Sequence, residues 1–477
     1  MNLNRLYQAV AASLLLLPLS TASMAQTADG RWDFTPRISV GQTFSDNIGL
    51  ASSGDEESEA ITRLDAGFAL DREGGRGRLR LDYNLLGLLY WEDGDRDDVF
   101  QQFDGDARFD IVPGQFFVEA DASFDQRTLN RDRPGDILTT DVDRTDVRTI
   151  AVTPVYVQRL EDIAAAELRY TYDRVDYSEA SETDSERNRI RARLDSGPVF
   201  ARTGWGLTFD RSEEDFDDGS SVTLESIEAL GRLNVTDRFS VFGAVGDEQN
   251  EFDQDPRRAQ PDDTFWRVGA TFEPSARTFM EGFFGNRFFG DTFGATLRHR
   301  IRDGRLFADY NETLRTVNEL RVTPIRDADG NLIFDGDTGR PIFELPDVRS
   351  GVYLSKRFSA GLTIRRARTR IGLRVYDESR EFELTDQGEQ AQGVIGDVSW
   401  RLRPRTQAFL FARLEENTFE DQRDREDTLF TTRVGVSRDL GPNTSATLDY
   451  TYRELDSTED VRDYTENRLT ARFTRTF

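Results

Sequence analysis

The sequence predicts an all-β fold, a transmembrane antiparallel up-and-down β-barrel. Segments about ten residues long, with alternating apolar and polar side chains, run from Thr35 to the terminal Phe477. Short and long connections alternate between them, and a secretory leader comes first. Outer-membrane barrels show this combination because each strand turns one face to lipid and the other to an aqueous lumen.

The leader carries Arg5, then the apolar run Ala9–Ser20, then the small-x-small pattern Ser23–Ala25. This is the pattern of a secretory signal peptide, so we expect residues 1–25 to be removed and 26–477 to form one barrel domain. An uncleaved helical anchor is disfavoured, because it needs about 20 apolar residues and this run is shorter and broken by a proline.

Connection lengths give the strand count. Short turns, most with Gly, Pro, Asn or Asp at hairpin positions, are expected at 73–77, 112–115, 159–162, 234–238, 273–277, 302–305, 403–406 and 439–443. Longer acidic stretches lie at 51–59, 92–98, 178–186, 212–220 and 419–427. Short periplasmic turns and long outer loops are typical of such barrels. The pattern predicts 22 strands with both termini periplasmic; 18 or 20 stay open, given bent strands near 348–366 and a tight reversal at 289–291.

Individual strands fix which side chains face lipid. The outward set includes Leu168, Tyr170, Leu448, Tyr450, Leu469 and Phe473, and tyrosines toward the strand ends are expected to form an aromatic girdle. A soluble β-sandwich is the alternative for any single strand. Some twenty such strands in succession disfavour it.

The last strand, 467–477, ends on an aromatic residue in the phase of Phe473. Phe473 and Phe477 resemble the C-terminal signal by which the barrel assembly machinery recognises its clients. We therefore expect that machinery to be a partner.

Composition narrows the function further. The formal net charge is −27 and the sequence pI is near 4.6, so nucleic acid is not an expected partner. The chain has no cysteine, which excludes disulfides and thiolate metal sites. A mean hydropathy of −0.61 does not separate a soluble chain from a barrel, because half of each strand and the loops are polar.

Catalytic and metal sites are not expected. His299 is the single histidine, and no nucleophile lies near it in sequence, so it is interpreted as a strand residue at the membrane interface. The acidic residues of the long connection 320–347 do not match the EF-hand spacing. A protruding or inward-folded hairpin turned at 329–331 is favoured there, and no cofactor is predicted. Acidic outer loops could hold divalent cations against lipopolysaccharide, or simply be solvated.

The inward strand faces are the candidate functional surface. The predicted pore-lining residues are Arg169, Arg189, Arg191, Arg193, Asp449, Arg453, Arg468 and Arg472. Structurally, arginine opposite carboxylate on neighbouring strands would form cross-strand pairs in a wetted interior. Functionally, guanidinium groups and tyrosines would grip the hydroxyls and carboxylates of a passing sugar chain.

The predicted size of the barrel raises the question of what closes its lumen. About 22 strands enclose a lumen that known transporters fill with a plug. Here the first strand begins soon after the leader, so no plug domain and no TonB-dependent receptor are expected. Inward loops or a periplasmic partner would close the lumen, unless it stays open.

Three segments, Thr35–Leu50, Arg78–Tyr90 and Gly285–Thr316, resemble the outer-membrane β-barrel family found with exosortase, PEP-CTERM and exopolysaccharide export loci. The resemblance spans nearly the whole mature chain but rests on strand patterns. It implies a role in export of a capsule or exopolysaccharide, together with a periplasmic polysaccharide export protein and an inner-membrane copolymerase.

The predicted function is therefore a conduit or anchor for exopolysaccharide in the outer membrane of a Gram-negative cell. A general porin for small solutes is one alternative. A structural or adhesive surface protein, acting through its acidic loops and the surrounding lipid and lipopolysaccharide, is another.

Overall fold

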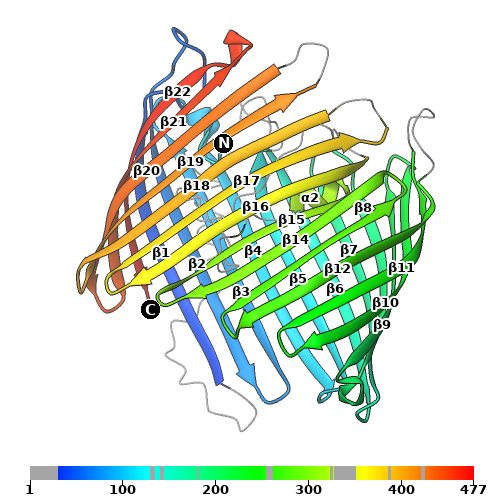
Figure 1. Ribbon diagram of the computed structural model, residues 1–477. Helices are drawn as coiled ribbons and strands as arrows, with labels where there is room; N and C mark the ends of the chain where they lie inside the picture. The colour runs from blue at the N-terminus through cyan, green and yellow to red at the C-terminus, as the bar shows by residue number, and fades with distance from the viewer. Residues whose placement is uncertain are drawn as a thin grey trace.

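The computed structural model describes residues 31–128, 135–139, 144–179, 182–253, 261–322, 326, 351–384, 388–420 and 425–477. Across these residues, 22 strands form one antiparallel sheet (Figure 1). The first half of the sheet comprises β1 (Arg31–Ser45), β2 (Glu59–Gly74), β3 (Gly77–Tyr90), β4 (Asp98–Val112), β5 (Phe116–Thr128), β6 (Arg144–Leu160), β7 (Ala164–Tyr177), β8 (Ser185–Ser196), β9 (Thr203–Phe216), β10 (Ser221–Thr236) and β11 (Phe239–Glu251). The second half comprises β12 (Asp263–Ser275), β13 (Thr278–Arg287), β14 (Gly290–Ile301), β15 (Gly304–Thr316), β16 (Val352–Arg366), β17 (Thr369–Phe382), β18 (Gly388–Arg403), β19 (Thr406–Phe419), β20 (Arg425–Gly441), β21 (Thr444–Ser457) and β22 (Tyr464–Thr476).

The sheet closes on itself, because β1 pairs with β22 as well as with β2. The closing register runs from Arg37 opposite Thr476 to Ser45 opposite Arg468. Closure leaves no strand edge with unpaired backbone groups, as a bilayer requires. The predicted count of 22 is confirmed, and 18 or 20 are excluded.

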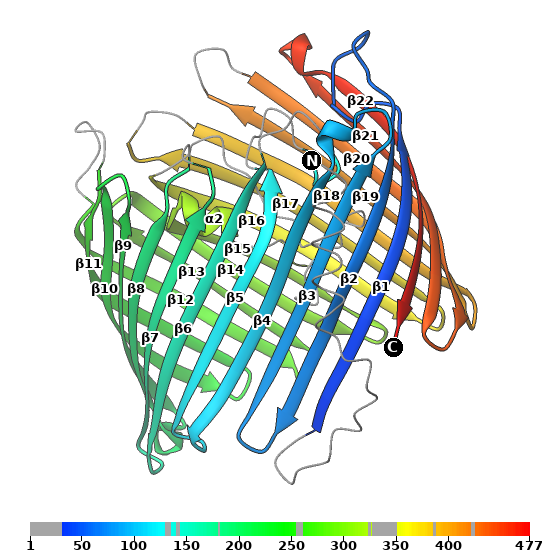
Figure 2. The same cartoon turned by 180° about the vertical axis from the view of Figure 1, so that it is seen from behind.

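The two ends of the barrel differ. Connections after even-numbered strands are tight and gather at one end, here called the short-turn end; those after odd-numbered strands form the long-loop end (Figures 1 and 2). All the short turns predicted from sequence lie at the short-turn end. The first strand begins there and the last strand ends there, where the Phe477 N–H donates to the Pro36 carbonyl at 2.9 Å.

Large apolar side chains cover the outer face, including those expected to face lipid. Exposed aromatic rings occur toward both ends of the strands, with Trp91 and Trp266 nearer the long loops and Tyr156, Trp205 and Trp400 nearer the short turns. An apolar band flanked by two aromatic girdles is how such barrels sit in a bilayer. No helix in the described part of the chain is long and apolar enough to cross a membrane.

The interior is not uniformly polar, contrary to the expectation of a wetted lumen. On β3, Leu86, Leu88 and Tyr90 face inward and are buried with Ile137 and Leu138. These last two belong to residues 135–139 of the β5–β6 connection, which we call the inner segment. The inner segment folds into the barrel, so the lumen contains an apolar cluster at its long-loop end.

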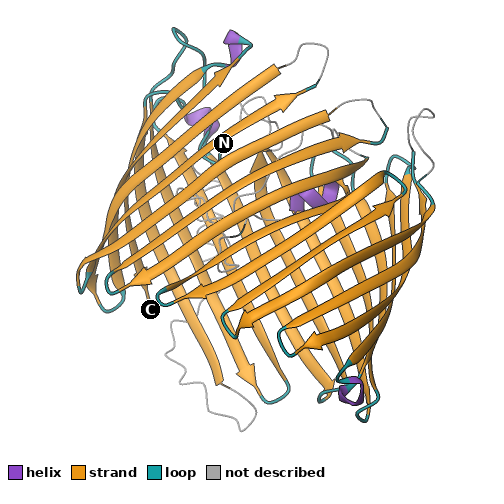
Figure 3. Ribbon diagram, viewed as in Figure 1, coloured by secondary structure: helices purple, strands orange, loops and turns teal. Residues whose placement is uncertain are grey.

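A second inward element is α2 (Val317–Val322), which lies within the barrel outline in both views and is the helix drawn there in purple in Figure 3. It follows β15. The adjoining end of β16 is buried on both faces, since the consecutive residues 352–355 are exposed by no more than 2%. Leu354 packs on Phe216 and Val222 of β9 and β10, whereas Tyr353 packs on Phe382 of β17. This end of the β15–β16 hairpin therefore lies inside the lumen.

Several local expectations need correction. The first strand begins at Arg31, not near Thr35. The acidic stretch 212–220 is mostly strand, because β9 continues to Phe216 and β10 starts at Ser221. Turns after β8 and β16 were not predicted. The hairpin expected at 329–331 and the leader lie outside the described residues.

Candidate functional site

The most regular feature of the inner face is a row of arginines on β8. Arg187, Arg189, Arg191 and Arg193 occupy alternate positions and share one face of the strand, while Ile190 points outward and is exposed. We call them the arginine ladder. Period-two alternation alone puts all four guanidinium groups on the lumen side.

Each ladder arginine has a carboxylate partner. Arg187 Nε lies 3.0 Å from Asp173, Arg189 Nε 3.2 Å from Asp210, and Arg193 Nε 2.6 Å from Asp195; Arg191 also pairs with Asp210. Side-chain exposure rises along the ladder from 18% to 39%, 48% and 61% toward the short-turn end. The guanidinium groups of Arg189, Arg191 and Arg193 therefore face solvent in the lumen.

The expected cross-strand pairing is confirmed at two rungs. Asp173 stands opposite Arg187, and Asp210 opposite Arg191. Arg169 departs from it, because its opposite residue on β8 is Arg191. Arg169 instead reaches Glu119 on β5 at 2.8 Å, passing over β6.

The inner segment is fastened to β21 and β22 by a buried ionic cluster. Asp136 accepts hydrogen bonds from Arg453 at 2.7 Å and Arg468 at 2.6 Å, and Arg468 also pairs with Glu466 at 2.7 Å. Ser45 of β1 donates to Glu466 at 2.6 Å. We call Asp136, Arg453, Glu466 and Arg468 the ionic latch.

Electrostatics explain why this latch holds. Burial by itself would raise the pKa of Asp136, but Arg453 and Arg468 outweigh it and hold the pKa well below its usual range. The latch connects the β5–β6 connection to β21 and β22 across the closing seam. Removing one partner of such a buried ion pair is strongly destabilising, because it leaves a buried charge without compensation.

Short contacts within the inner segment support the same geometry. Asp136 Oδ1 accepts the backbone N–H of Leu138 at 2.9 Å, and the Tyr90 hydroxyl donates to the Leu138 carbonyl at 3.0 Å. Arg144 donates to the Ile137 carbonyl at 2.9 Å. The segment is thus held together by hydrogen bonds from side chains to its carbonyls, by ion pairs and by apolar packing.

The remaining predicted residues lie on the same inner face. Asp449 is buried and accepts hydrogen bonds from Nε and Nη2 of Arg433 on β20, at 2.9 and 2.8 Å. Arg472 shares the phase of Arg468 on β22. Of the predicted set, the structure brings Arg453 and Arg468 together in the latch, and Arg189 and Arg191 together at one aspartate.

The α2 helix follows β15 but is hydrogen-bonded to β7 and β8. Asn318 donates to Ser185 Oγ at 3.0 Å, and the Tyr177 hydroxyl donates to the Asn318 side-chain carbonyl at 3.3 Å. Glu319 lies 3.7 Å from Arg187 at the top of the arginine ladder. Between β15 with α2 and strands β8–β10 lies a cavity of about 280 Å³.

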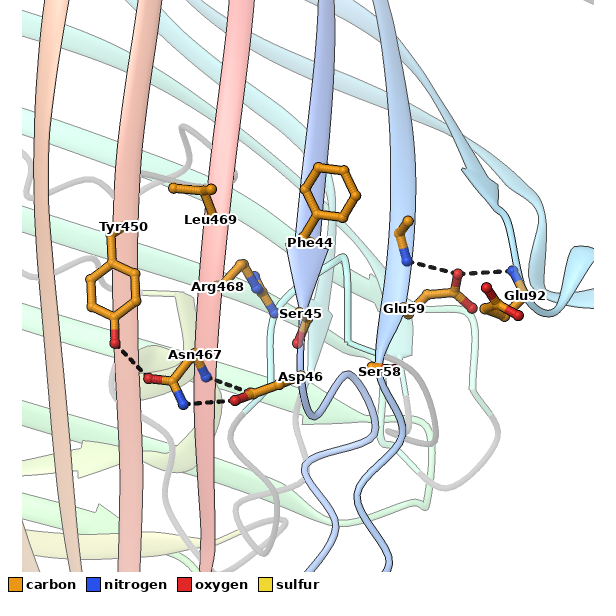
Figure 4. Close-up of a pocket in the computed structure, with 11 residues that line it drawn as sticks. Phe44, Ser45, Asp46, Ser58, Glu59, Glu92, Tyr450, Asn467, Arg468 and Leu469 are labelled. Carbon is orange, nitrogen blue, oxygen red and sulfur yellow. Dashed lines mark hydrogen bonds between the residues drawn. The ribbon is translucent and has the colours of Figure 1, made fainter.

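A second hollow, of about 520 Å³, lies at the closing seam near the long loops (Figure 4). Phe44 and Leu469 are paired across the seam, and the Asn467 side chain accepts from Tyr450 and donates to Asp46 at 2.7 Å. Phe44, Tyr450 and Leu469 are exposed, so this hollow opens on the lipid-facing side.

Other predicted features lie apart from these sites. Phe473 and Phe477 are exposed on the outer face at the short-turn end. His299 shares a hydrogen bond of 2.9 Å with Thr278 near the same end. Within the described ranges, no group of three or more His, Cys, Asp or Glu side chains could hold a metal ion.

Sequence reasoning missed Asp136, Glu466 and Arg187. Arg187 and Glu466 could have been found, because each continues the period-two phase of a predicted arginine. Asp136 gives no such signal, since it lies in a connection whose inward course depends on tertiary contacts.

Comparison with known proteins identifies the fold. No protein-family model matches the chain, and no curated protein matches it. The FrpB iron transporter of Neisseria meningitidis (F3-3 variant) matches with a TM-score of 0.53 at 9% identity, covering 93% of this chain and 82% of that one. A mutant of the ferric enterobactin receptor PfeA of Pseudomonas aeruginosa matches at 0.51 and 10%, covering 94% and 81%. The siderophore receptor PirA of Acinetobacter baumannii matches at 0.50 and 10%, covering 93% and 80%.

At about a tenth identity these matches show a shared architecture, not a shared ligand. The closed barrel with an even strand number and an apolar outer belt is itself the form in which bacterial proteins cross the outer membrane. The protein is an outer-membrane β-barrel.

Proposed function

We propose that the protein is a conduit through which exopolysaccharide leaves a Gram-negative cell. The observation that carries the proposal is the solvent-facing arginine ladder on β8, with its carboxylate partners. Guanidinium forks and carboxylates offer donors and acceptors to the hydroxyls of a sugar chain at each step, without one tight site. The resemblance of its strand segments to the exopolysaccharide-locus family supports the same cargo.

In this proposal the long-loop end faces outward and both strand termini face the periplasm, as the asymmetry of outer-membrane barrels suggests. The short-turn mouth, where the ladder is most exposed, would receive the polymer from a periplasmic polysaccharide export protein. The inner segment and α2 narrow the lumen nearer the outside. Passage would require that one or both move.

Planar-bilayer conductance tests this proposal. The purified barrel should carry a current that the exopolysaccharide of its own cell blocks reversibly. Replacing Arg189, Arg191 and Arg193 by alanine should shorten each blockade. Replacing three arginines exposed at the short-turn end, Arg368, Arg403 and Arg405, is the matched control and should leave the blockades unchanged.

Other outcomes contradict the proposal in distinct ways. A current that polysaccharide never blocks favours a general porin, and no current in any condition favours a surface anchor. Iron chelates are the ligands named for the fold neighbours. Blockade by ferric enterobactin, without blockade by polysaccharide, would favour uptake of such chelates.

A further inference from the structure

The cavity beside α2 contains a buried carboxylate with an unused oxygen. Glu214 on β9 is 3% exposed and lines this cavity of about 280 Å³. The hydroxyls of Ser185 and Thr316 neighbour the carboxylate, but Glu214 Oε2 is buried without any hydrogen-bond partner. A buried acceptor without a donor is costly, so its presence at a cavity wall points to a ligand that supplies the donor.

The rest of the cavity has two kinds of wall. The Arg189–Asp210 ion pair and the Ser212 hydroxyl give a polar wall on β8 and β9, whereas Leu224 and Leu314 give an apolar one. A sugar ring has the same division, with hydroxyls at its edge and C–H groups on its faces. The volume lies at the lower limit of about 300 Å³ for small-molecule pockets, which suits one sugar unit.

The charges around the cavity disfavour a cationic or an anionic ligand. Arg187 stands opposite Glu214 in the sheet and also lines the cavity, so a metal ion or an amine would meet a neighbouring positive charge. An anionic group would instead meet the carboxylate. A neutral hydroxyl pays neither penalty.

We propose that this cavity binds one neutral sugar unit, with a hydroxyl donating to Glu214 Oε2 and the ring face on Leu224. The inference rests on the proposed polysaccharide function and makes it specific. It places a selective binding step beside α2 and Arg187, at the long-loop end of the arginine ladder.

Saturation-transfer NMR on the full-length barrel in detergent tests this site, with glucose, galactose, mannose and N-acetylglucosamine as the probes. At least one should bind saturably. Glu214→Gln replaces a carboxylate oxygen with an amide nitrogen, which donates hydrogen bonds and cannot accept one from a sugar hydroxyl, so affinity should fall about tenfold or more. Glu213→Gln is the control, because Glu213 is the next residue on β9 and pairs with the exposed Arg211; it should bind like the wild type.

A second variant guards against misfolding of the first. Leu224→Trp fills the cavity without changing a charge and should also abolish binding, and heat-modifiable gel mobility should show all variants folded. Binding by none of the four sugars overturns the site, as does equal binding by Glu214→Gln. If polysaccharide still blocks the bilayer current in either case, the export function stands and this cavity has no part in it.

Discussion

Replacing Asp136 by alanine should release the inner segment from the barrel wall. Asp136 Oδ2 takes hydrogen bonds from Arg453 and Arg468 at 2.7 and 2.6 Å, and Oδ1 takes the Leu138 N–H at 2.9 Å. The substitution removes all of these contacts. The apolar packing of Ile137 and Leu138 and the hydrogen bonds from Tyr90 and Arg144 to their carbonyls would remain to hold the segment.

The size of the effect follows from what the two arginines keep. Removing one partner of a buried ion pair costs about 3–5 kcal/mol. Glu466 remains 2.7 Å from Arg468 and 3.6 Å from Arg453, so neither cation is left alone. We therefore expect the lower end, about 3 kcal/mol, which lowers the ratio of latched to released segment roughly a hundredfold.

Cysteine labelling measures the release directly. The chain has no cysteine, so a Leu138→Cys variant carries a single reporter at a site that is 2% exposed. A membrane-impermeant maleimide should label it slowly in the latched barrel. Adding Asp136→Ala should speed labelling by up to about a hundredfold, and conductance should rise with it.

Asp55→Ala, in the exposed part of the β1–β2 loop, is the matched control. It should change neither the labelling rate of the cysteine at position 138 nor the conductance. Equal labelling rates with and without Asp136 would refute the reasoning. They would mean that the apolar packing and the hydrogen bonds from Tyr90 and Arg144 suffice to hold the segment, and that the ionic latch contributes nothing to its position.

Three further predictions concern assembly, α2 and pH. Phe477→Ala should lower the folded fraction that reaches the outer membrane, whereas Phe358→Ala, at a comparably exposed ring away from the C-terminus, should not; heat-modifiable mobility of membrane fractions checks this. Asn318→Ala should cost about 1–2 kcal/mol and loosen α2, seen as faster labelling of a cysteine at position 317. The pKa of Asp136 is depressed in the folded protein, so its stabilisation is present above the unfolded aspartate pKa of about 3.9 and is lost only as pH falls through the lower folded value. Conductance should therefore not change between about pH 7 and pH 5, and opening of the lumen in that range would contradict this assignment.

The fold was predictable because its signal is local. Alternation at period two placed Leu168 outside and Arg189 inside before any contact was known, and Gly- or Pro-containing turns fixed most of the hairpins. The turn after β16 was missed because Ala367 adopts a φ of +50° there. That left-handed conformation usually marks glycine or asparagine, and neither is present.

The interior was less predictable, since inward-facing residues depend on what fills the lumen. Leu86 and Leu88 lie in the phase that suggested a wet face, yet they are buried under Ile137 and Leu138. The stretch 212–220 was predicted to be a loop because most of its residues are acidic or polar. Glu214 is instead a buried, inward strand residue that stands opposite Arg187 on β8.

The central claim is that one face of β8 lines a water-filled passage and the other faces lipid. A cysteine scan of positions 189–193 in proteoliposomes tests it most directly, with an impermeant thiol reagent. Cysteines replacing Arg189, Arg191 and Arg193 should react, and those replacing Ile190 and Ala192 should not. Uniform reaction at all five positions, or reaction only at positions 190 and 192, would contradict the account.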